Sequence, residues 1–89
     1  MILIRRIVGD SMLPTMHHGQ IIFAWRGRHL SQGAVVVLKH QGLEKIKRIS
    51  EIKDGQVFVL GDNPSKSTDS RSFGWVDRKS VIGKVFWPR

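Results

Sequence analysis

Short β-branched runs, separated by glycine, proline, asparagine and aspartate, are the feature that most limits what this chain can fold into. No segment shows a convincing helical period. The Asp54-Gly55 pair between two runs is typical of a tight hairpin. Closely spaced strands of this kind predict an all-β fold, a compact coiled antiparallel sheet or partial barrel. About six short strands are expected, at Ile2–Val8, Gln20–Trp25, Ala34–His40, Leu43–Ile52, Gln56–Leu60 and Val81–Trp87.

Length and composition restrict the class of protein. The 89 residues, 40% of them hydrophobic, suffice for one small domain spanning residues 1–89. The net charge of +8 suits nucleic acid, an anionic membrane surface or an acidic partner, and selects none of them. The chain has no cysteine, which excludes disulfides, thiolate zinc sites and thiol nucleophiles. No apolar run approaches the ~18 residues of a spanning helix, so the sequence predicts a cytoplasmic protein, with peripheral membrane contact as an alternative.

Two segments interrupt the strand pattern. Gly9–Thr15 is a polar loop after an apolar strand, and it presents Ser11 as the best-placed hydroxyl nucleophile. Gly9 would let the backbone approach a substrate closely, and the amides of the turn could face a developing oxyanion. Capping of the turn by the serine is the alternative interpretation. Gly61–Gly74 is a loop of fourteen residues, long enough in a small domain to indicate function or disorder.

A serine nucleophile needs a base, and the pattern offers histidines and lysines. In Leu43–Ile49, the alternation puts Lys45 and Lys47 on the face opposite Arg48, so either face buries a charged side chain. Burial lowers the pKa of a lysine, and the neutral amine can then accept the proton of a serine. A solvated basic strand is the alternative. The spacing alone does not choose among the candidates, which are His17, His18, His29, His40, Lys39, Lys45, Lys47 and Lys53.

Three segments taken together resemble the type I signal peptidase family, the serine–lysine peptidases. Two apolar segments between them, Gly19–Phe23 and Gly33–Val37, are similar to the core strands of that family. The resemblance covers nearly the whole chain in the same order. The three segments are Gly9-Asp10-Ser11-Met12-Leu13-Pro14-Thr15-Met16, Lys45-Ile46-Lys47-Arg48-Ile49, and the loop Gly61-Asp62-Asn63 through Ser67, Asp69-Ser70-Arg71 and Phe73-Gly74.

The resemblance implies a role for each matching residue and a catalytic core like that of signal peptidases and LexA. Ser11 would be the nucleophile that forms an acyl-enzyme, and Lys47 the general base. Ser67 would orient that lysine. An ion pair between Asp69 and Arg71 would hold the loop beside the site. Met12 and Pro14 would shape the pocket and the turn.

The resemblance also implies the substrate and the absence of cofactors. The substrate would be a protein precursor bound as an extended strand, from which an N-terminal segment is removed without a metal or cofactor. Gly9 departs from the family, since many members carry a hydroxyl residue there, so the oxyanion hole would rest on the backbone amides of Gly9 and Ser11. The loop of residues 61–74 is most similar to that of nickel superoxide dismutase maturation proteases.

Other classes of function remain open. A basic nucleic-acid-binding β-barrel would use the positive charge together with aromatic platforms, but the aromatic residues are scattered, which makes nucleic acid an unfavoured partner. A LexA-type self-cleaving domain shares the serine–lysine chemistry but lacks the loop of residues 61–74. A catalytically inactive relative used as a binding module is the remaining alternative. The aromatic candidates are Phe23, Trp25, Trp75 and Trp87.

Overall fold

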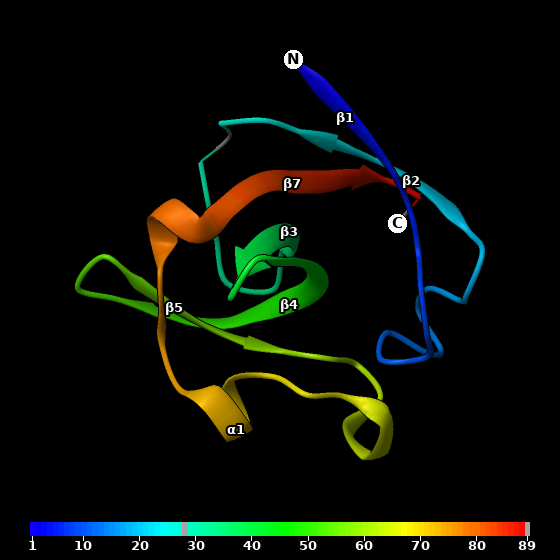
Figure 1. Cartoon of the computed structure of the whole chain (residues 1–89). Helices are drawn as coiled ribbons and strands as arrows, with labels where there is room; N and C mark the ends of the chain where they lie inside the picture. Colours follow the sequence, from blue (N-terminus) through cyan, green and yellow to red (C-terminus); the bar gives the residue numbers. More distant parts are fainter. Residues whose placement is uncertain (28, 89) are drawn as a thin grey trace.

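The predicted strands are present at nearly the expected positions in the computed structural model, which describes residues 1–27 and 29–88 (Figure 1). Four of the six predicted ranges differ from the structure by one or two residues at one end. β1, for example, ends at Arg6 and not at Val8. The strands are β1 (Ile2–Arg6), β2 (Ile21–Trp25), β3 (Val35–His40), β4 (Leu43–Lys53), β5 (Gln56–Leu60), β6 (Val76–Asp77) and β7 (Val81–Trp87).

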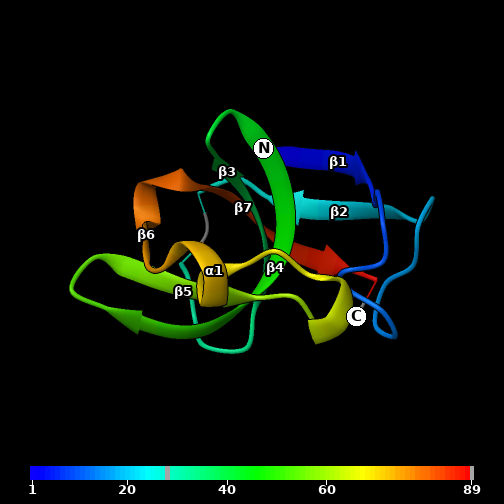
Figure 2. The same ribbon diagram turned by 60° about the horizontal axis from the view of Figure 1, so that its bottom comes forward.

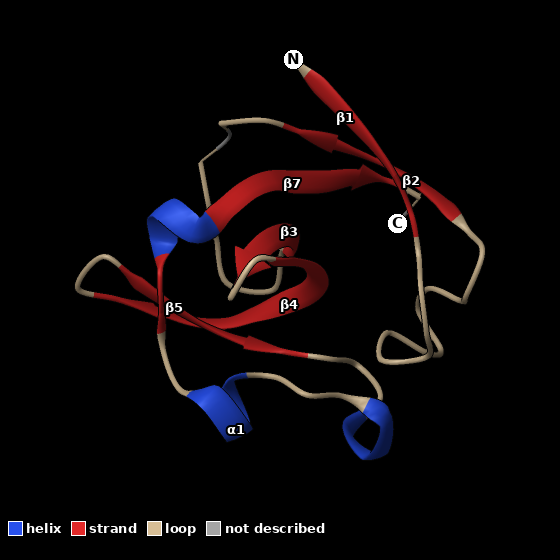
Figure 3. Ribbon diagram, viewed as in Figure 1, coloured by secondary structure: helices blue, strands red, loops and turns tan. Residues whose placement is uncertain are grey.

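In the part of the chain that the structure describes, helical structure is confined to three short turns, coloured blue in Figure 3. They are the 3-10 turns η1 (Pro64–Lys66) and η2 (Arg78–Ser80) and the four-residue helix α1 (Ser70–Phe73). Across residues 1–27 and 29–88, no helix has the length and hydrophobicity needed to traverse a lipid bilayer.

The strands form one antiparallel sheet in the order β1-β2-β7-β3-β4-β5-β6. The sheet is strongly coiled, because β1 at one edge and β4, four places away, are joined by an ion pair between Arg5 and Glu44. Figure 2 shows β1 and β2 side by side, with α1 against β5. The expected all-β, coiled antiparallel fold is confirmed, as an open sheet of seven strands. The two-residue β6 was not predicted, since two residues carry no alternation that a pattern could reveal.

β3 lies between two hydrophobic clusters and explains the apolar run at its position. Val35 and Val37 pack into one cluster, with Met12 of the β1–β2 loop. Val36 and Leu38 point to the other face and pack into the second cluster. A strand buried on both faces needs a continuous apolar run and not an alternating one. β3 therefore joins the half of the core beneath Ser11 to the half beneath the long loop.

Tight turns set the register of β4 against its two neighbours. The turns at Gln41-Gly42 and Asp54-Gly55 both hold two successive residues at positive φ, 51° and 79° in the first and 51° and 76° in the second. Two successive positive φ angles are what a type I′ hairpin turn requires. The hairpin predicted at Asp54-Gly55 is confirmed. These two turns fix which face of β4 carries Lys47.

Candidate active site

Ser11 lies in the loop that joins β1 to β2, and the base of this loop is closed by backbone hydrogen bonds. The Ile7 amide donates to the Gln20 carbonyl and the Gly19 amide donates to the Ile7 carbonyl, both at 2.8 Å. Met12, only 1% exposed, anchors the loop in the core directly after Ser11. The serine itself is half-buried. An anchored, partly accessible hydroxyl is what a nucleophile requires.

Gly9 provides the turn that leads into Ser11. Its φ is +84°, a conformation that favours glycine. Its amide donates a hydrogen bond of 2.9 Å to Nδ1 of His18. The Gly9 amide therefore already has an acceptor, and of the two amides expected to form an oxyanion hole, Ser11 is the one left for that role. The contact of His18 is one that sequence reasoning missed, because nothing in its spacing connects it to Gly9.

Lys47 lies in the middle of β4, and its side chain is almost completely removed from solvent. The residue is 5% exposed, and its Nζ donates a hydrogen bond of 3.1 Å to Oγ of Ser67. Burial lowers the pKa of Lys47 below its ordinary value; the charge of Asp69 opposes this effect, while Lys45 and Arg71 add to it. Of the four lysines that the pattern left open, Lys47 is the buried one among the described residues.

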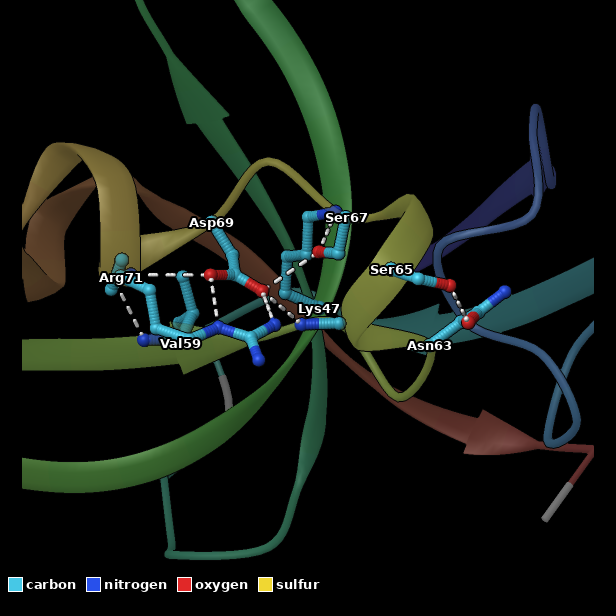
Figure 4. A network of polar contacts seen from close by, with 9 residues as sticks. Lys47, Val59, Asn63, Ser65, Ser67, Asp69 and Arg71 are labelled. Atoms are coloured by element: carbon cyan, nitrogen blue, oxygen red, sulfur yellow. Dashed lines mark hydrogen bonds and ion pairs between the residues drawn. The ribbon is translucent and has the colours of Figure 1, made fainter.

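Ser67 connects this lysine to a buried carboxylate, as Figure 4 shows. Its Oγ donates to Oδ2 of Asp69 at 2.8 Å, so that the hydroxyl accepts from the lysine and donates to the aspartate. The expected ion pair of Asp69 with Arg71 is present, and the Arg71 Nε donates to Oδ1 at 2.9 Å. Four of the predicted side chains are thus linked by successive contacts, in the order Lys47, Ser67, Asp69 and Arg71.

Asp69 stays ionised although it is only 1% exposed. Burial by itself would raise the pKa of Asp69, but hydrogen bonds from Arg71, from the Gly61 amide and from Ser67 together hold that pKa well below the ordinary range. The Gly61 amide donates at 2.9 Å. A buried carboxylate with several donors is a rigid anchor, and this one fixes the position of Ser67.

The long loop also holds the loop that carries Ser11. The Asn63 amide donates to the Ser11 carbonyl at 2.8 Å, and Asn63 Nδ2 donates to the Asp10 carbonyl at 3.0 Å. Gly61 lies where a Cβ atom would come within 2.6 Å of the Ser67 Cβ and 2.7 Å of the Ser11 carbonyl oxygen. Only glycine fits between the two. This close approach was not predicted, because nothing in the sequence distinguishes Gly61 from an ordinary turn residue.

A second ion pair supports the same arrangement from β4. Arg48 donates to both carboxylate oxygens of Asp62, at 2.9 and 2.8 Å, and to the Gly33 carbonyl at 2.8 Å. Thr15 of the serine loop donates to the same carboxylate at 2.6 Å. The guanidinium lowers the pKa of Asp62 below its ordinary value, mainly through these hydrogen bonds. Asp62 therefore joins β4, the long loop and the serine loop at one point.

Ser11 and Lys47 line the same cleft, which has a volume of about 300 Å³. Residues 5–8, 11 and 12 form one wall and residues 44–47 the other. Met12 lines the cleft, as expected of a residue that shapes the pocket, whereas Pro14 is exposed in the turn beyond. None of the four histidines of the chain is part of this lining. The structure thus places the Ser11 hydroxyl and a desolvated lysine in one cleft, with Ser67 bonded to that lysine.

Two further kinds of site were considered from the sequence, a metal site and an aromatic surface for nucleic acid. Within the described residues, no three or more His, Asp or Glu side chains converge as ligands for a metal ion. The aromatic residues pack on each other, with ring centroids 4.5 Å apart for Trp25 and Phe86 and 5.5 Å for Phe23 and Trp87. Trp75 contacts Phe58 on another part of the sheet. Phe86 also stacks on Phe23 at 6.3 Å, so Phe23, Trp25, Phe86 and Trp87 form one cluster on β2 and β7. The expectation that the aromatic residues are scattered is therefore wrong for this group and holds for Trp75 alone among the four candidates.

Comparison with known proteins shows to which family the chain belongs. A family described as "Signal peptidase, peptidase S26" matches residues 38–89, more than half of the chain. Among curated proteins, Signal peptidase I of Bacillus caldolyticus is 43% identical over 49 residues, which cover 52% of this chain and 27% of the relative. Signal peptidase IB of Staphylococcus aureus is 37% identical over 67 residues, covering 57% and 35%. The fold and site define a peptidase-like β-domain, and the chain belongs to the signal peptidase family.

The matches cover only part of this chain and only part of each relative. The matched residues 38–89 include Lys47, Ser67, Asp69 and Arg71, whereas Ser11 lies outside them. The chain spans about a third or less of the length of the two relatives. Membership of the family is therefore established, while the activity and the assignment of the catalytic residues depend on the site geometry.

Proposed function

We propose that this chain is a serine endopeptidase in which Ser11 is the nucleophile and Lys47 the general base. The observation that carries the proposal is the state of Lys47, which is 5% exposed, bonded to Ser67 and in a common cleft with Ser11. Burial lowers the pKa of Lys47, so its amine loses its proton, and becomes able to act as a base, at a lower pH than that of an exposed lysine. Such an environment is costly, which favours a functional explanation.

In the first half of the reaction, the neutral amine of Lys47 takes the proton from the Ser11 hydroxyl. The Ser11 Oγ forms a bond to the carbonyl carbon of the scissile peptide, and the carbonyl oxygen becomes an oxyanion. The amide of Ser11 donates to that oxyanion. Lys47 then gives its proton to the leaving nitrogen, the C–N bond breaks, and an ester with Ser11 remains.

In the second half of the reaction, water hydrolyses the ester on Ser11, and Lys47 again acts as the base. Lys47 takes a proton from water, the hydroxide attacks the ester carbonyl, and the proton returns to Ser11 as the C–O bond breaks. Ser67 accepts an N–H of the amine and so restricts the rotation of a long, flexible side chain. Orientation of this kind lowers the entropic cost of bringing the amine to the nucleophile.

The sheet edge and the relatives support the substrate class that we propose. β1 is an edge strand, and Ile7 and Val8 beyond its end line the cleft, so a precursor in extended form can add beside them. The relatives are named as signal peptidases, and we propose removal of an N-terminal segment by analogy. Contact with a membrane periphery is part of this proposal, since the apolar side chains of Ile2, Ile4 and Trp87 are exposed.

A narrower assignment concerns the precursor itself. The loop from Gly61 to Gly74 resembles that of nickel superoxide dismutase maturation proteases, and we propose a precursor of that kind as the substrate. The test is incubation of such a precursor with the protein, with mass spectrometry of its N-terminus. A single cut that removes the leader is expected, and an intact leader beside cleavage of other precursors would contradict the assignment.

The central experiment compares the wild-type protein with Ser11→Ala, Lys47→Ala and Lys47→Arg on a library of precursor N-termini. All three variants should lose activity by about 10³-fold or more, and Ser11→Ala with Lys47→Ala should lose no more than either alone, because the residues act as a unit. Arginine cannot replace lysine, since its guanidinium does not deprotonate at working pH. A brief reaction of the wild type should leave an acyl adduct on the peptide that contains Ser11.

Two exposed residues provide controls for these substitutions. Ser31 is exposed and lies outside the cleft, and Ser31→Ala should keep wild-type activity. Lys53 is exposed at the end of β4, and Lys53→Ala should do the same. Turnover by Ser11→Ala comparable to that of the controls would contradict the proposed mechanism.

A further inference from the structure

Lys45 lies two residues before Lys47 on β4, so the two side chains leave the strand on the same face. Their cross-strand partners on β3 are Leu38 and Val36, which belong to the second hydrophobic cluster. The two backbone positions are roughly 7 Å apart, at about 3.3 Å per residue. Both lysines also line the cleft that contains Ser11. A second cation therefore lies beside the proposed base.

The ring of Phe73 contacts this second cation. The Lys45 Nζ lies over the ring, 5.0 Å from its centroid, a distance at which an aromatic ring attracts an ammonium group. The imidazole of His40, at the end of β3, stacks on the same ring with centroids 4.1 Å apart. Together, His40 and the second hydrophobic cluster hold the ring in place. The ring in turn restricts a long side chain that could otherwise extend into solvent.

Phe73 also belongs to the segment that holds the hydrogen-bond partner of Lys47. It is the last residue of α1, and Asp69 caps the first turn of that helix. The Phe73 amide donates to the Asp69 carbonyl at 3.1 Å. The Asp69 carboxylate accepts the hydrogen bond of Ser67, whose Oγ accepts that of Lys47. One short helix thus fixes both the ring that contacts Lys45 and the carboxylate that holds Ser67.

The balance of charge around Lys47 explains why a second cation matters. The Asp69 carboxylate favours a protonated Lys47, but Arg71 forms an ion pair with that carboxylate. The Lys45 ammonium is then a surplus positive charge on this face of β4, and a like charge nearby disfavours the protonated form of a lysine. The other charged or titratable groups that line the cleft or contact the partners of the two lysines are Arg5, Arg6, Glu44 and His40.

We propose that Phe73 holds the Lys45 ammonium beside Lys47, and that this second cation favours the neutral, proton-accepting form of the Lys47 amine. The inference rests on the proposed peptidase function and adds Lys45 and Phe73 to it as positioning residues, which act through Lys47. When Lys47 has taken the proton of Ser11, the repulsion between the two ammonium groups favours its transfer to the leaving nitrogen. The same charge therefore assists both proton transfers of the first half of the reaction.

There are two alternatives, that Lys45 and Phe73 only pack α1 onto the sheet and that Lys45 only contacts the substrate. In either case, substitution would change stability or KM, and the rate would change by the same factor at every pH. An effect of charge on Lys47 depends on pH. It slows the reaction where Lys47 must first lose a proton, and it disappears where Lys47 is already neutral.

The experiment measures the pH profile of kcat/KM for two substitutions of Lys45. Lys45→Met keeps the length of the side chain without its charge, and its rate should be about threefold lower on the rising limb, the size expected of two charges about 7 Å apart in largely aqueous surroundings. The rate should equal that of the wild type at high pH. Lys45→Arg keeps the charge, which can also lie over the ring, and should retain the wild-type profile. Lys53→Met removes a charge at the exposed end of β4 and should leave the profile unchanged.

A double-mutant cycle tests the role of the ring. Phe73→Leu keeps an apolar side chain, and it should move the profile in the same direction as Lys45→Met. In the Lys45→Met protein, Phe73→Leu should have no further effect on the profile, because no cation is left for the ring to hold. A shift of the same size in both backgrounds would mean that the ring acts through packing alone and would overturn the inference.

Titration of Lys47 followed by NMR separates this inference from the peptidase function. The protein carries isotope-labelled lysine, and the Lys47 signal is identified by its absence from Lys47→Arg. Lys47 should release its proton at a higher pH in Lys45→Met than in the wild type. That result without cleavage of any peptide would support the inference and contradict the peptidase function. An unchanged titration in Lys45→Met would overturn the inference, even where the wild type cuts peptides.

Discussion

Lys47 and Arg48 are neighbours in β4, and their side chains leave the strand on opposite faces to hold two parts of the same loop. Lys47 bonds to Ser67, while Arg48 bonds to Asp62. The alternation of side chains along a strand makes this division unavoidable. One short stretch of β4 therefore carries both the proposed base and a support for the serine loop, which Asp62 contacts through Thr15.

The support given by Arg48 predicts coupling between two residues that do not touch a substrate. Arg48→Ala and Asp62→Ala should each destabilise the protein, and a double-mutant cycle should give a coupling of about 1 kcal/mol. The figure is modest because the Arg48 side chain is 36% exposed and solvent screens the pair. Urea denaturation of the four proteins measures the coupling. Strictly additive losses would mean that the pair contributes nothing.

The buried state of Lys47 predicts a pH dependence of activity. Because its pKa is lowered, the amine should become neutral, and activity should rise, at a pH below the ordinary value of about 10.4 for lysine. A pH–rate profile of kcat/KM gives the apparent pKa of the base. A rising limb centred at the ordinary lysine value would contradict the assignment of Lys47 as a desolvated base.

The lowered pKa of Lys47 also predicts how the stability of the protein depends on pH. The folded state binds Lys47's proton more weakly than the unfolded state does, so Lys47 favours unfolding progressively as pH falls from the ordinary lysine pKa to the lowered one. Stability should therefore gain a contribution as pH rises through this window. Lys47→Met should remove that part of the slope while Lys53→Met, at an exposed position, should retain it. Urea midpoints measured between pH 7 and pH 10 provide the comparison.

Gly61 predicts a steric effect at the junction of the two loops. Gly61→Ala would press a methyl group against the Ser67 Cβ and the Ser11 carbonyl, and overpacking of this kind typically costs about 1–3 kcal/mol. Activity should fall as well, since both neighbours belong to the site. The loss is measured by urea denaturation and by kcat on a cleavable peptide.

Gly27→Ala is the matched control for Gly61→Ala. Gly27 has open space around it and a φ of +73°, so its substitution costs backbone strain of about 1 kcal/mol without a clash, and Gly27 does not line the cleft. Stability should fall with activity retained. If Gly61→Ala were as active as Gly27→Ala, the close approach at Gly61 would have no functional consequence.

The sequence predicted the strands well because their determinants are local. β-branched runs and the Asp54-Gly55 turn indicate strands and a hairpin without knowledge of the rest of the chain. The alternation in β4 indicated that a charged side chain would be buried, but not which one. That choice depends on the coiling of the sheet and on Ser67 and Asp69 from a distant loop, which spacing cannot reveal.

The features that were missed are contacts between segments far apart in sequence. Asn63 bonds to the Ser11 carbonyl across more than fifty residues, and Arg5 reaches Glu44 across 39. No local sequence pattern identifies either contact, since single asparagine and arginine residues are common on protein surfaces. The family resemblance supplied the roles of Ser67, Asp69 and Arg71, of which the ion pair and the hydrogen bond to Lys47 are present in the structure.

His18 provides a test of how precisely the serine loop must be held. Its Nδ1 accepts the Gly9 amide hydrogen at 2.9 Å, two residues before Ser11. His18→Ala removes this acceptor and should lower kcat about tenfold with little change in KM, because small displacements of a nucleophile slow the reaction more than they weaken binding. His18→Asn places its Oδ1 on Cγ, as Nδ1 is, and should restore most of the rate. His18→Gln moves the oxygen one carbon further and should not. Equal rates for the Asn and Gln variants would mean that this hydrogen bond does not position Ser11, and that the other contacts of the loop suffice to hold it.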